Sequence, residues 1–278
     1  MLSVRTEGQV VHRLLEGLPV IGVTSLGDEI YLLKPKGGHD QVEVYDVISY
    51  RLLRCLTVPN ARGFIDMTSC QHFLCLYICD HNVRRVHRLD LQGNSTNWPV
   101  SDAPWSISVN AGHNLIVTCP RVGKIKEFSP RGDLLRDVTL PRDVINPLHA
   151  RQLTSGQFMV CHGDLDDPIH RVCKLGEDGG HIIKSHGGRR GSNIGRYDEP
   201  AHLAVDDNEF VFVVDAGNRR VTLLSPTLDY IRQVVSRDQF KWRPHRVCLD
   251  VQRRRLYVAE NEFKGGNFTV GRVVVFSV

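Results

Sequence analysis

The sequence lacks the patterns that define several common functional classes. Its 278 residues include eight cysteines, but no two have CxxC spacing, so the spacings of zinc fingers and redox motifs are absent. There is also no G-x-S-x-G, no P-loop and no H-E-x-x-H. We therefore expect no cofactor. Whether the chain is an enzyme is uncertain from the sequence, and these absences favour a non-catalytic protein.

The sequence also lacks targeting and membrane signals. The opening "MLSVRTEGQVVHRLLEG" carries charges where a secretory signal has an apolar region. No apolar run approaches the roughly 18 residues that a membrane span requires. We expect a reduced, cytoplasmic protein with no membrane partner. The sequons at Asn94 and Asn267 weakly oppose this expectation. The net charge of +4 neither demands nor excludes a nucleic-acid partner.

The sequence contains a long repeat. Six segments share the same order of short apolar runs and turns, and they start at Pro19, Arg62, Pro104, Pro147, Pro200 and Pro244. The spacings are 43, 42, 43, 53 and 44 residues, and the long one holds the insert "HGGRRGSNIGRYDE" (186–199). No helical period survives across a copy. This pattern predicts an all-β, six-bladed β-propeller with four antiparallel strands per blade.

The repeat predicts a single domain over residues 1–278. The expected blades cover 18–58, 59–100, 101–141, 146–185, 198–236, and 243–278 together with 4–17. The last copy ends at Val278 after its third strand, and "EGQVVHRLLEG" (7–17) matches the fourth-strand positions of other copies. We therefore expect the N-terminal strand to complete the last blade and to leave no open sheet edge.

One copy carries a recognisable motif. Pro200, Val205-Asp206 and "VVDAGNRRV" match the early Pro, the apolar strand with Asp and the V-x-D-x-x-N-x-R-V run of the NHL repeat, which the chain resembles. "CDHNVRRV" (79–86) is a looser match. The chain is unlike WD40 proteins, since it has no Trp-Asp dipeptide. The resemblance implies a six-bladed propeller, with structural roles for the motif residues Asp80, Arg85, Asp215, Asn218 and Arg220.

A rigid propeller with variable loops suits recognition, although fold alone does not settle function. The main prediction is a non-catalytic, monomeric binding module that recognises a protein or peptide on one face. Many NHL domains follow a RING and a coiled coil in ubiquitin ligases. This sequence has neither element, so within such a system it would be the substrate-recognition part alone. The candidate surface combines the channel mouth and the 186–199 insert: Trp105, His149, His202, His245, Arg246, Arg189, Arg190 and Arg196.

RNA binding is the first alternative. NHL domains of the RNA-binding type use a basic face to hold phosphates and bases. The insert supplies Arg189, Arg190 and Arg196 in one long loop, and long loops on a rigid scaffold often carry function. RNA is therefore a possible partner.

A metal-dependent lyase or lactonase is the second alternative. His149, His202 and His245 stand near the starts of three copies, where the chain enters the innermost strand. The peptide-amidating lyases of the NHL type use channel histidines around zinc. Here the histidines lie on adjacent blades, and His245 is one place out of register, so ordinary loop histidines are favoured over a metal site. "DLDD" (164–167) is similarly interpreted as a turn rather than a Ca²⁺ or acid–base site.

Overall fold

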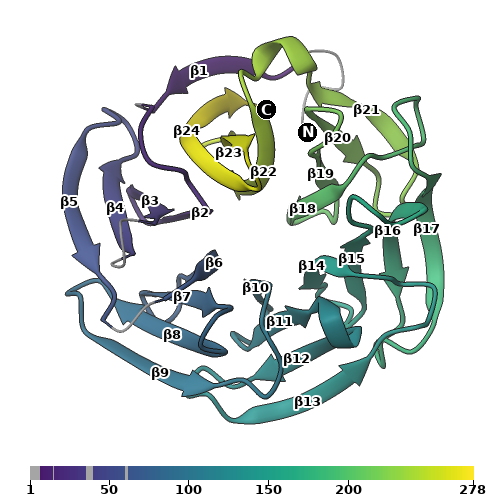
Figure 1. The fold of residues 1–278 in the computed structure, drawn as a ribbon, viewed down its shortest axis with the longest axis horizontal. Coiled ribbons are helices and arrows are strands. Elements are labelled where there is room, and N and C mark those ends of the chain that lie inside the picture. Colours follow the sequence, from purple (N-terminus) through teal and green to yellow (C-terminus); the bar gives the residue numbers. More distant parts are fainter. Residues whose placement is uncertain (1–6, 15, 36–39, 60–61) are drawn as a thin grey trace.

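The computed structural model describes residues 7–14, 16–35, 40–59 and 62–278. Six four-stranded antiparallel sheets are arranged as the blades of a ring around a central channel (Figure 1). Within these residues the helical elements are two single 3₁₀ turns, η1 (Pro120–Val122) and η2 (Arg237–Gln239). None of the described helices is long and apolar enough to cross a membrane. The predicted all-β, six-bladed propeller is confirmed.

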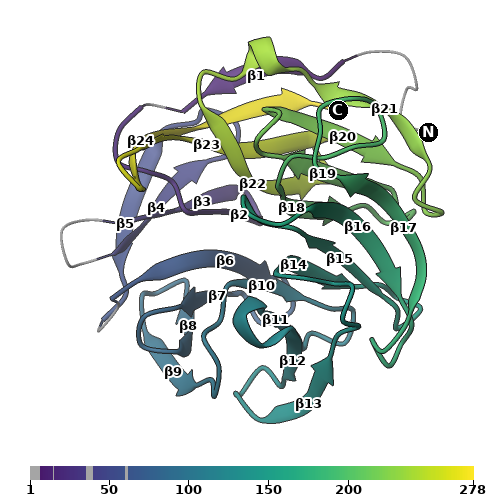
Figure 2. The ribbon, with the colours of Figure 1, turned by 45° about the vertical axis from the view of Figure 1, so that its right-hand side comes forward.

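Each blade is a meander whose first strand lies against the channel, and Figure 2 shows the blades from an oblique angle. Blade one contains β2 (Gly22–Leu26), β3 (Glu29–Lys34), β4 (Gln41–Asp46) and β5 (Leu52–Thr57). Blade two contains β6 (Phe64–Cys70), β7 (Cys75–Asp80), β8 (Arg85–Asp90) and β9 (Ser95–Pro99). Blade three contains β10 (Ser106–Val109), β11 (Leu115–Cys119), β12 (Lys124–Phe128) and β13 (Leu134–Thr139).

The remaining blades follow the same order, except at the chain ends. Blade four contains β14 (Pro147–Gln152), β15 (Phe158–His162), β16 (Ile169–Leu175) and β17 (Ile182–Arg189). Blade five contains β18 (Pro200–Val205), β19 (Val211–Asp215), β20 (Arg220–Leu224) and β21 (Tyr230–Val235). Blade six contains β22 (Arg243–Asp250), β23 (Arg255–Lys264), β24 (Asn267–Ser277) and β1 (Gln9–Arg13). Because β17 continues to Arg189, the first residues of the insert lengthen an outer strand.

Burial decreases from the second strand of a blade to its outer strand. The strands of one blade therefore differ in how regularly apolar and polar residues alternate along them. Every residue of β7 is buried, whereas β13 is largely exposed. The hydrophobic clusters lie between neighbouring blades, as where Leu33 of blade one packs with Ile78 of blade two. Full burial of such a side chain contributes about 1.5–3 kcal/mol. Each blade is therefore stabilised mainly by its neighbours in the ring.

The two ends of the chain meet in blade six. Strand β1 pairs antiparallel with β24, with Gln9 opposite Ser277 and Arg13 opposite Val274. The Leu14 N–H also donates to the Val273 carbonyl at 2.9 Å. The predicted completion of the last blade by the N-terminal strand is confirmed over Gln9–Arg13. Residues 4–6 and 15 of the predicted 4–17 segment lie outside the described residues.

We predict that this closure depends on Leu14, which is buried in a cluster with Val273 and Tyr257. Leu14→Ala is expected to lower the free energy of unfolding by about 2–5 kcal/mol, because it leaves a cavity next to β1, beside the other strands of blade six. Val11→Ala is the control, since Val11 is 41% exposed and its loss is expected to cost less than about 0.5 kcal/mol. Urea denaturation measures both. Equal destabilisation by the two variants would contradict the inferred role of Leu14.

Candidate functional site

The innermost strands carry a layer of side chains into the channel at one shared position. In blades two, four, five and six, the pairing of the innermost strand with the next one shifts register after its first residues, at Phe64/Asp66, Pro147/His149, Pro200/His202 and Pro244/Arg246. Such bulges re-aim the side chains that follow them. The four residues at the equivalent position after the bulge are therefore Asp66, His149, His202 and Arg246.

Cavities open at the two ends of the channel. The residues that precede this shared position, such as Ile65, Leu148 and Ala201, line a cavity of about 250 Å³, which we call the apolar cavity. Residues at and beyond it, such as His149 and Arg151, line a cavity of about 340 Å³, which we call the polar cavity. Because the six innermost strands run in the same direction along the channel, the two cavities lie at opposite mouths.

Asp66, His149 and His202 form a buried cluster between the cavities. One ligand atom of each lies within 4.8 Å of those of the others. The imidazole rings of His149 and His202 are in contact with centroids 3.7 Å apart and planes tilted by 34°, and His202 Nε2 lies 3.6 Å from Asp66 Oδ2. The side chains come from β6, β14 and β18, so three blades have to be in place to build the cluster.

Arg246 fixes the charge of Asp66. Its Nε donates to Asp66 Oδ1 at 2.9 Å and its Nη2 donates to the Ile65 carbonyl at 2.7 Å. The Ile107 N–H donates to Asp66 Oδ2 at 3.1 Å. Burial opposes ionisation of Asp66, but the charge of Arg246 and the contact with His202 outweigh it and hold the pKa of Asp66 below its usual range. Asp66 is therefore a carboxylate at neutral pH.

Both histidines of the cluster are neutral. Burial lowers the pKa of His149 well below its ordinary value, and the neighbouring His202 lowers it further. Burial also lowers the pKa of His202, despite Asp66. Among the described residues, Nδ1 of either ring has no hydrogen-bond partner. Two neutral imidazoles and one carboxylate oxygen form a donor set that suits zinc and similar divalent ions, so these residues fit a metal.

The structure separates the histidines that the sequence grouped together. His245 lies before the shared position and faces the apolar cavity, where Asn261 Nδ2 donates to its Nε2 at 3.2 Å and Phe268 lies 4.9 Å from its ring. Asp66 takes the third place in the cluster. Sequence analysis missed Asp66, although "FID" in the second copy occupies the same position as "PLH" and "PAH" in the fourth and fifth. Trp105 also faces the apolar cavity.

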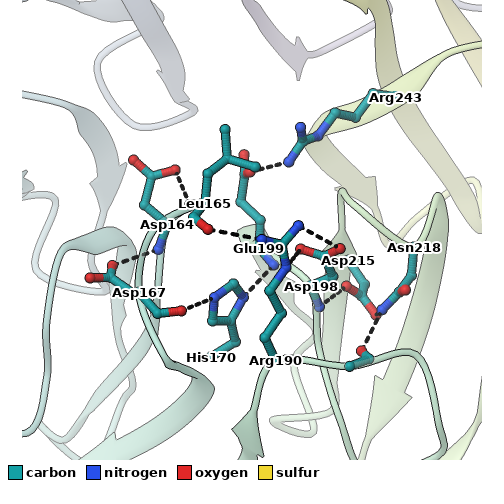
Figure 3. Close-up of polar contacts among 11 residues, drawn as sticks. Asp164, Leu165, Asp167, His170, Arg190, Asp198, Glu199, Asp215, Asn218 and Arg243 are labelled. Atoms are coloured by element: carbon teal, nitrogen blue, oxygen red, sulfur yellow. Dashed lines mark hydrogen bonds and ion pairs between the residues drawn. The ribbon is translucent and has the colours of Figure 1, made fainter.

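The motif residues of blade five support the insert, and Figure 3 shows two of them, Asp215 and Asn218. Asp215 Oδ2 accepts from Arg220 Nε at 2.7 Å and from Asn218 Nδ2 at 2.8 Å. Arg220 also donates to the carbonyls of Ser192 and Arg196 at 2.8 and 2.6 Å. Burial raises the pKa of Asp215 to about 6, against the charge of Arg220. These residues hold the insert against blade five.

The equivalent residues of blade two are arranged differently. Asp80 is buried and accepts from the Arg62 N–H at 2.9 Å and the Val83 N–H at 3.3 Å, which caps the turn between β7 and β8. Arg85 instead donates to Asn97 on the outer strand β9. The looser sequence match of this copy thus corresponds to a looser polar network.

The arginines of the insert differ in their engagement. Arg190 pairs with Asp198 at 2.8 Å and donates to the Leu165 carbonyl at 2.9 Å, which ties the insert to the loop between β15 and β16 (Figure 3). Arg189 and Arg196 are exposed. In the same loop, Asp167 Oδ2 accepts from the Asp164 N–H at 2.8 Å, as in a turn. Two arginines thus remain accessible from the surface.

The comparisons with known proteins agree on the fold. No family model matches the chain, and no curated protein matches it, so membership of the NHL family stays a prediction. A streptogramin B lyase structure is 11% identical, with 95% of this chain and 97% of that chain covered and a TM-score of 0.65. The hydrazine synthase of Kuenenia stuttgartiensis is 14% identical, with 91% and 95% covered and a TM-score of 0.64. A structural-genomics target provisionally assigned as a gluconolactonase is 16% identical, with 96% and 92% covered and a TM-score of 0.65.

These identities establish a shared propeller fold. The structures named above are described as those of enzymes, one of them provisionally, which contradicts the prediction of a non-catalytic protein- or peptide-binding module and favours the lyase or lactonase alternative. No linear motif marks the cluster in the channel, because it is assembled from separate blades. The expected protein, peptide or RNA partners, the monomeric state and the cytoplasmic location stay predictions.

We predict that Asp66 and Arg246 form an energetically coupled pair. Asp66→Asn is expected to lower the free energy of unfolding by about 3–5 kcal/mol, because it leaves the buried Arg246 without a counter-charge. Asp66→Leu combined with Arg246→Met is expected to cost less than the sum of the two single changes. Urea denaturation of the unchanged protein, Asp66→Leu, Arg246→Met and the double variant measures the coupling.

The exposed pair Lys184–Asp229, 3.9 Å apart, is the control for this cycle. Its coupling is expected to be below about 1 kcal/mol. A coupling between Asp66 and Arg246 no larger than this value would refute the inferred dependence.

Proposed function

We propose that this protein is a metal-dependent enzyme of the lyase or lactonase class that opens a small cyclic ester in the polar cavity. The observation that carries the proposal is the buried cluster of Asp66, His149 and His202, whose ligand atoms lie within 4.8 Å of one another beside that cavity. The similar enzyme propellers support the class. Low identity means that the assignment of residues rests on this chain's own geometry.

The protonation states support metal binding. Desolvation keeps both imidazoles neutral, so no proton has to leave before their nitrogens coordinate. Arg246 keeps Asp66 ionised and occupies Oδ1, which leaves Oδ2 facing His202. A divalent ion bound there would polarise an ester carbonyl and lower the pKa of a bound water.

The lining of the polar cavity favours a lactone among possible substrates. Thr24 and Ser69 form a hydroxyl pair at 2.9 Å, and Ser108 and Asn110 add further polar groups, which suit a substrate with several hydroxyls. Arg151 lines the same cavity, and among the described residues it has no hydrogen-bond or ion-pair partner. Burial lowers the pKa of Arg151, yet a guanidinium remains charged at neutral pH. The half-buried guanidinium is therefore free to bind an anionic substrate group, with Asp207 as an opposing charge on the same cavity.

Ester hydrolysis supplies such an anion. Water adds to the carbonyl carbon, the ring C–O bond breaks, and the leaving oxygen takes up a proton to give a hydroxy acid, whose carboxylate carries the charge. We infer that Arg151 stabilises the negative charge that develops on the carbonyl oxygen and then the product carboxylate. In this mechanism His149, His202 and Asp66 would hold the metal, while Arg151 and the hydroxyl side chains would orient the substrate.

We predict stoichiometric binding of a divalent metal that depends on His202. Titration calorimetry of the chelator-treated protein with Zn²⁺ and Mn²⁺ is expected to give one site, and His202→Ala is expected to weaken it at least about 100-fold, since changes even to residues behind ligands cost about 10–100-fold. His181→Ala is the matched control, because the side chain of His181 is 65% exposed. Hydrolysis of a panel of sugar-acid lactones is followed in parallel. Absence of metal binding, or lactonase activity that survives the chelator, would rule the proposal out.

We predict that Arg151 contributes to turnover rather than to metal binding. Arg151→Gln is expected to lower kcat/KM for the lactone about 10²–10³-fold, as removal of an oxyanion donor does, and to leave the metal stoichiometry intact. Arg131→Gln, in an exposed turn between β12 and β13, is the control. An unchanged kcat/KM for Arg151→Gln would remove Arg151 from the mechanism without affecting the metal site.

A further inference from the structure

The apolar cavity at the opposite mouth is built differently from the polar cavity. Trp105, Leu148 and the hairpin residues Leu165, Phe263 and Phe268 line it. Phe263 is 50%, Leu165 41% and Phe268 38% exposed, so large apolar side chains surround the mouth without cover from the described residues. Concave sites with an apolar lining and a few polar groups are typical of small-molecule binding. Arg246, which is paired with Asp66, also lines this cavity, whereas His149 and His202 line the polar cavity.

Glu199 is the half-buried carboxylate that faces this cavity. It lies between the insert and β18, its side chain is 18% exposed, and it forms an ion pair with Arg243, toward which its carboxylate points in Figure 3. Its φ of 60° is unusual for a residue with a side chain and costs about 1–3 kcal/mol. The fold therefore maintains a strained backbone at the position that brings this carboxylate to the cavity.

A network of hydrogen bonds holds the Glu199 backbone in place (Figure 3). The Glu199 N–H donates to His170 Nδ1 at 2.7 Å, and His170 Nε2 is 2.9 Å from the Asp167 carbonyl oxygen. Because Nδ1 accepts, Nε2 carries the proton and donates to Asp167. The Ala216 N–H donates to the Glu199 carbonyl at 2.9 Å. Glu199 is thus fixed from β16, from the loop before it and from the motif turn of blade five.

When Glu199 is ionised, the charges around it leave an excess of one negative charge. Asp164 lines the cavity from the adjacent loop, and Arg243 is opposed by Glu199 itself. The other charged neighbours are matched in pairs, Asp198 with Arg190 and Arg246 with Asp66. Burial of His245 lowers its pKa well below the ordinary value, so His245 adds no charge. An anion in this cavity would meet two carboxylates, whereas a cation would balance them.

We propose that the apolar cavity binds a small organic ammonium ion, with its apolar body against Trp105, Phe263 and Phe268 and its charged nitrogen at Glu199 and Asp164. Aromatic faces attract cations as well as apolar groups, and a carboxylate beside them supplies the counter-charge. This site goes beyond the proposed lactonase function, since it lies at the other mouth of the channel and requires no metal.

The protonation of Glu199 gives the proposal a second signature. Burial raises the pKa of Glu199 to about 7, against the charge of Arg243, and Asp164 and Asp198 raise it further. An ammonium ion favours the ionised form, so binding displaces a proton from the fraction of molecules in which Glu199 is protonated. The affinity for an amine that stays protonated is therefore expected to rise as the pH increases from about 6 to about 8.

The test is calorimetric titration with three ligands of similar shape: 2-phenylethylamine as its ammonium ion, 2-phenylethanol and 3-phenylpropionate. We expect the ammonium ion to bind at least about 10-fold more tightly than either of the others. Its binding is also expected to release protons from the protein, which is measured by repeating the titration in buffers of different ionisation enthalpy. Equal affinity for the ammonium ion and the alcohol would show an apolar pocket without charge selection, and tighter binding of the carboxylate would reverse the assignment. Either result overturns the proposal.

Variants connect the binding to named residues. Glu199→Gln is expected to abolish both the preference for the ammonium ion and the pH dependence, while Glu177→Gln, an exposed residue between β16 and β17, leaves both unchanged. Trp105→Leu keeps the carboxylates and is expected to weaken the ammonium ion several-fold with its pH dependence intact, which keeps the test decisive if Glu199→Gln fails to fold. Ammonium binding unaffected by both variants would exclude this cavity. The measurement is made on chelator-treated protein, so its failure is distinct from failure of the lactonase proposal.

Discussion

The channel sites depend on hydrogen bonds between the two ends of the chain, because in blade six β1 is held to β24 by pairing rather than by continuous backbone. Blades one and six are then neighbours, and Asn261 of β23 exchanges hydrogen bonds with the backbone of Val20 at 2.9 and 3.1 Å. Only in a closed ring can Arg246 of blade six reach Asp66 of blade two across the channel. Closure, ring geometry and the buried ion pair therefore stabilise one another.

The ring repeats a backbone feature and varies the residue that it presents. The bulge in the innermost strand recurs in blades two, four, five and six, so the equivalent residue of each of these blades faces the channel at the same level along its axis. Asp66, His149, His202 and Arg246 share that position, whereas Gly22 and Ser106 stand at the corresponding start of β2 and β10. The backbone is repeated six times, but the polar layer is asymmetric, and this asymmetry is what makes a single metal or substrate site possible.

The fold could be predicted from the sequence because its determinants are local. Strand alternation, turn residues and the spacing of copies are properties of short segments, and the unpaired fourth strand follows from counting them. The polar cluster could not be predicted in the same way. The bulge moves Arg246, and not His245, into the layer, and Asp66 joins it from a copy with no Pro-x-His signal. Glu199 was overlooked for a related reason, since its significance comes from burial and from Arg243 and Asp164, which are distant in sequence.

The motif of blade five shows how sequence similarity and function can diverge at one site. Asp215, Asn218 and Arg220 are the residues that resemble the NHL repeat, and their contacts are directed at the insert and the turn rather than at either cavity. They nevertheless affect the apolar mouth, because the Asp198 N–H donates to Asp215 Oδ1 at 2.8 Å immediately before Glu199. A motif that resembles a family can thus be structural and still determine where a half-buried carboxylate lies.

The electrostatic balance of the channel distinguishes its two mouths. Asp66 and Arg246 neutralise each other in the middle layer, so the charge beyond that layer is set by the residues of each cavity. In the polar cavity the charge of Arg151 is opposed by that of Asp207, so the proposed metal is what would make this cavity positive and favour an anionic substrate group or product. Glu199 and Asp164 leave the apolar cavity negative by one charge after Arg243 is counted. One channel can therefore offer a site for an oxyanion at one mouth and a site for an ammonium ion at the other, with the Asp66–Arg246 pair between them.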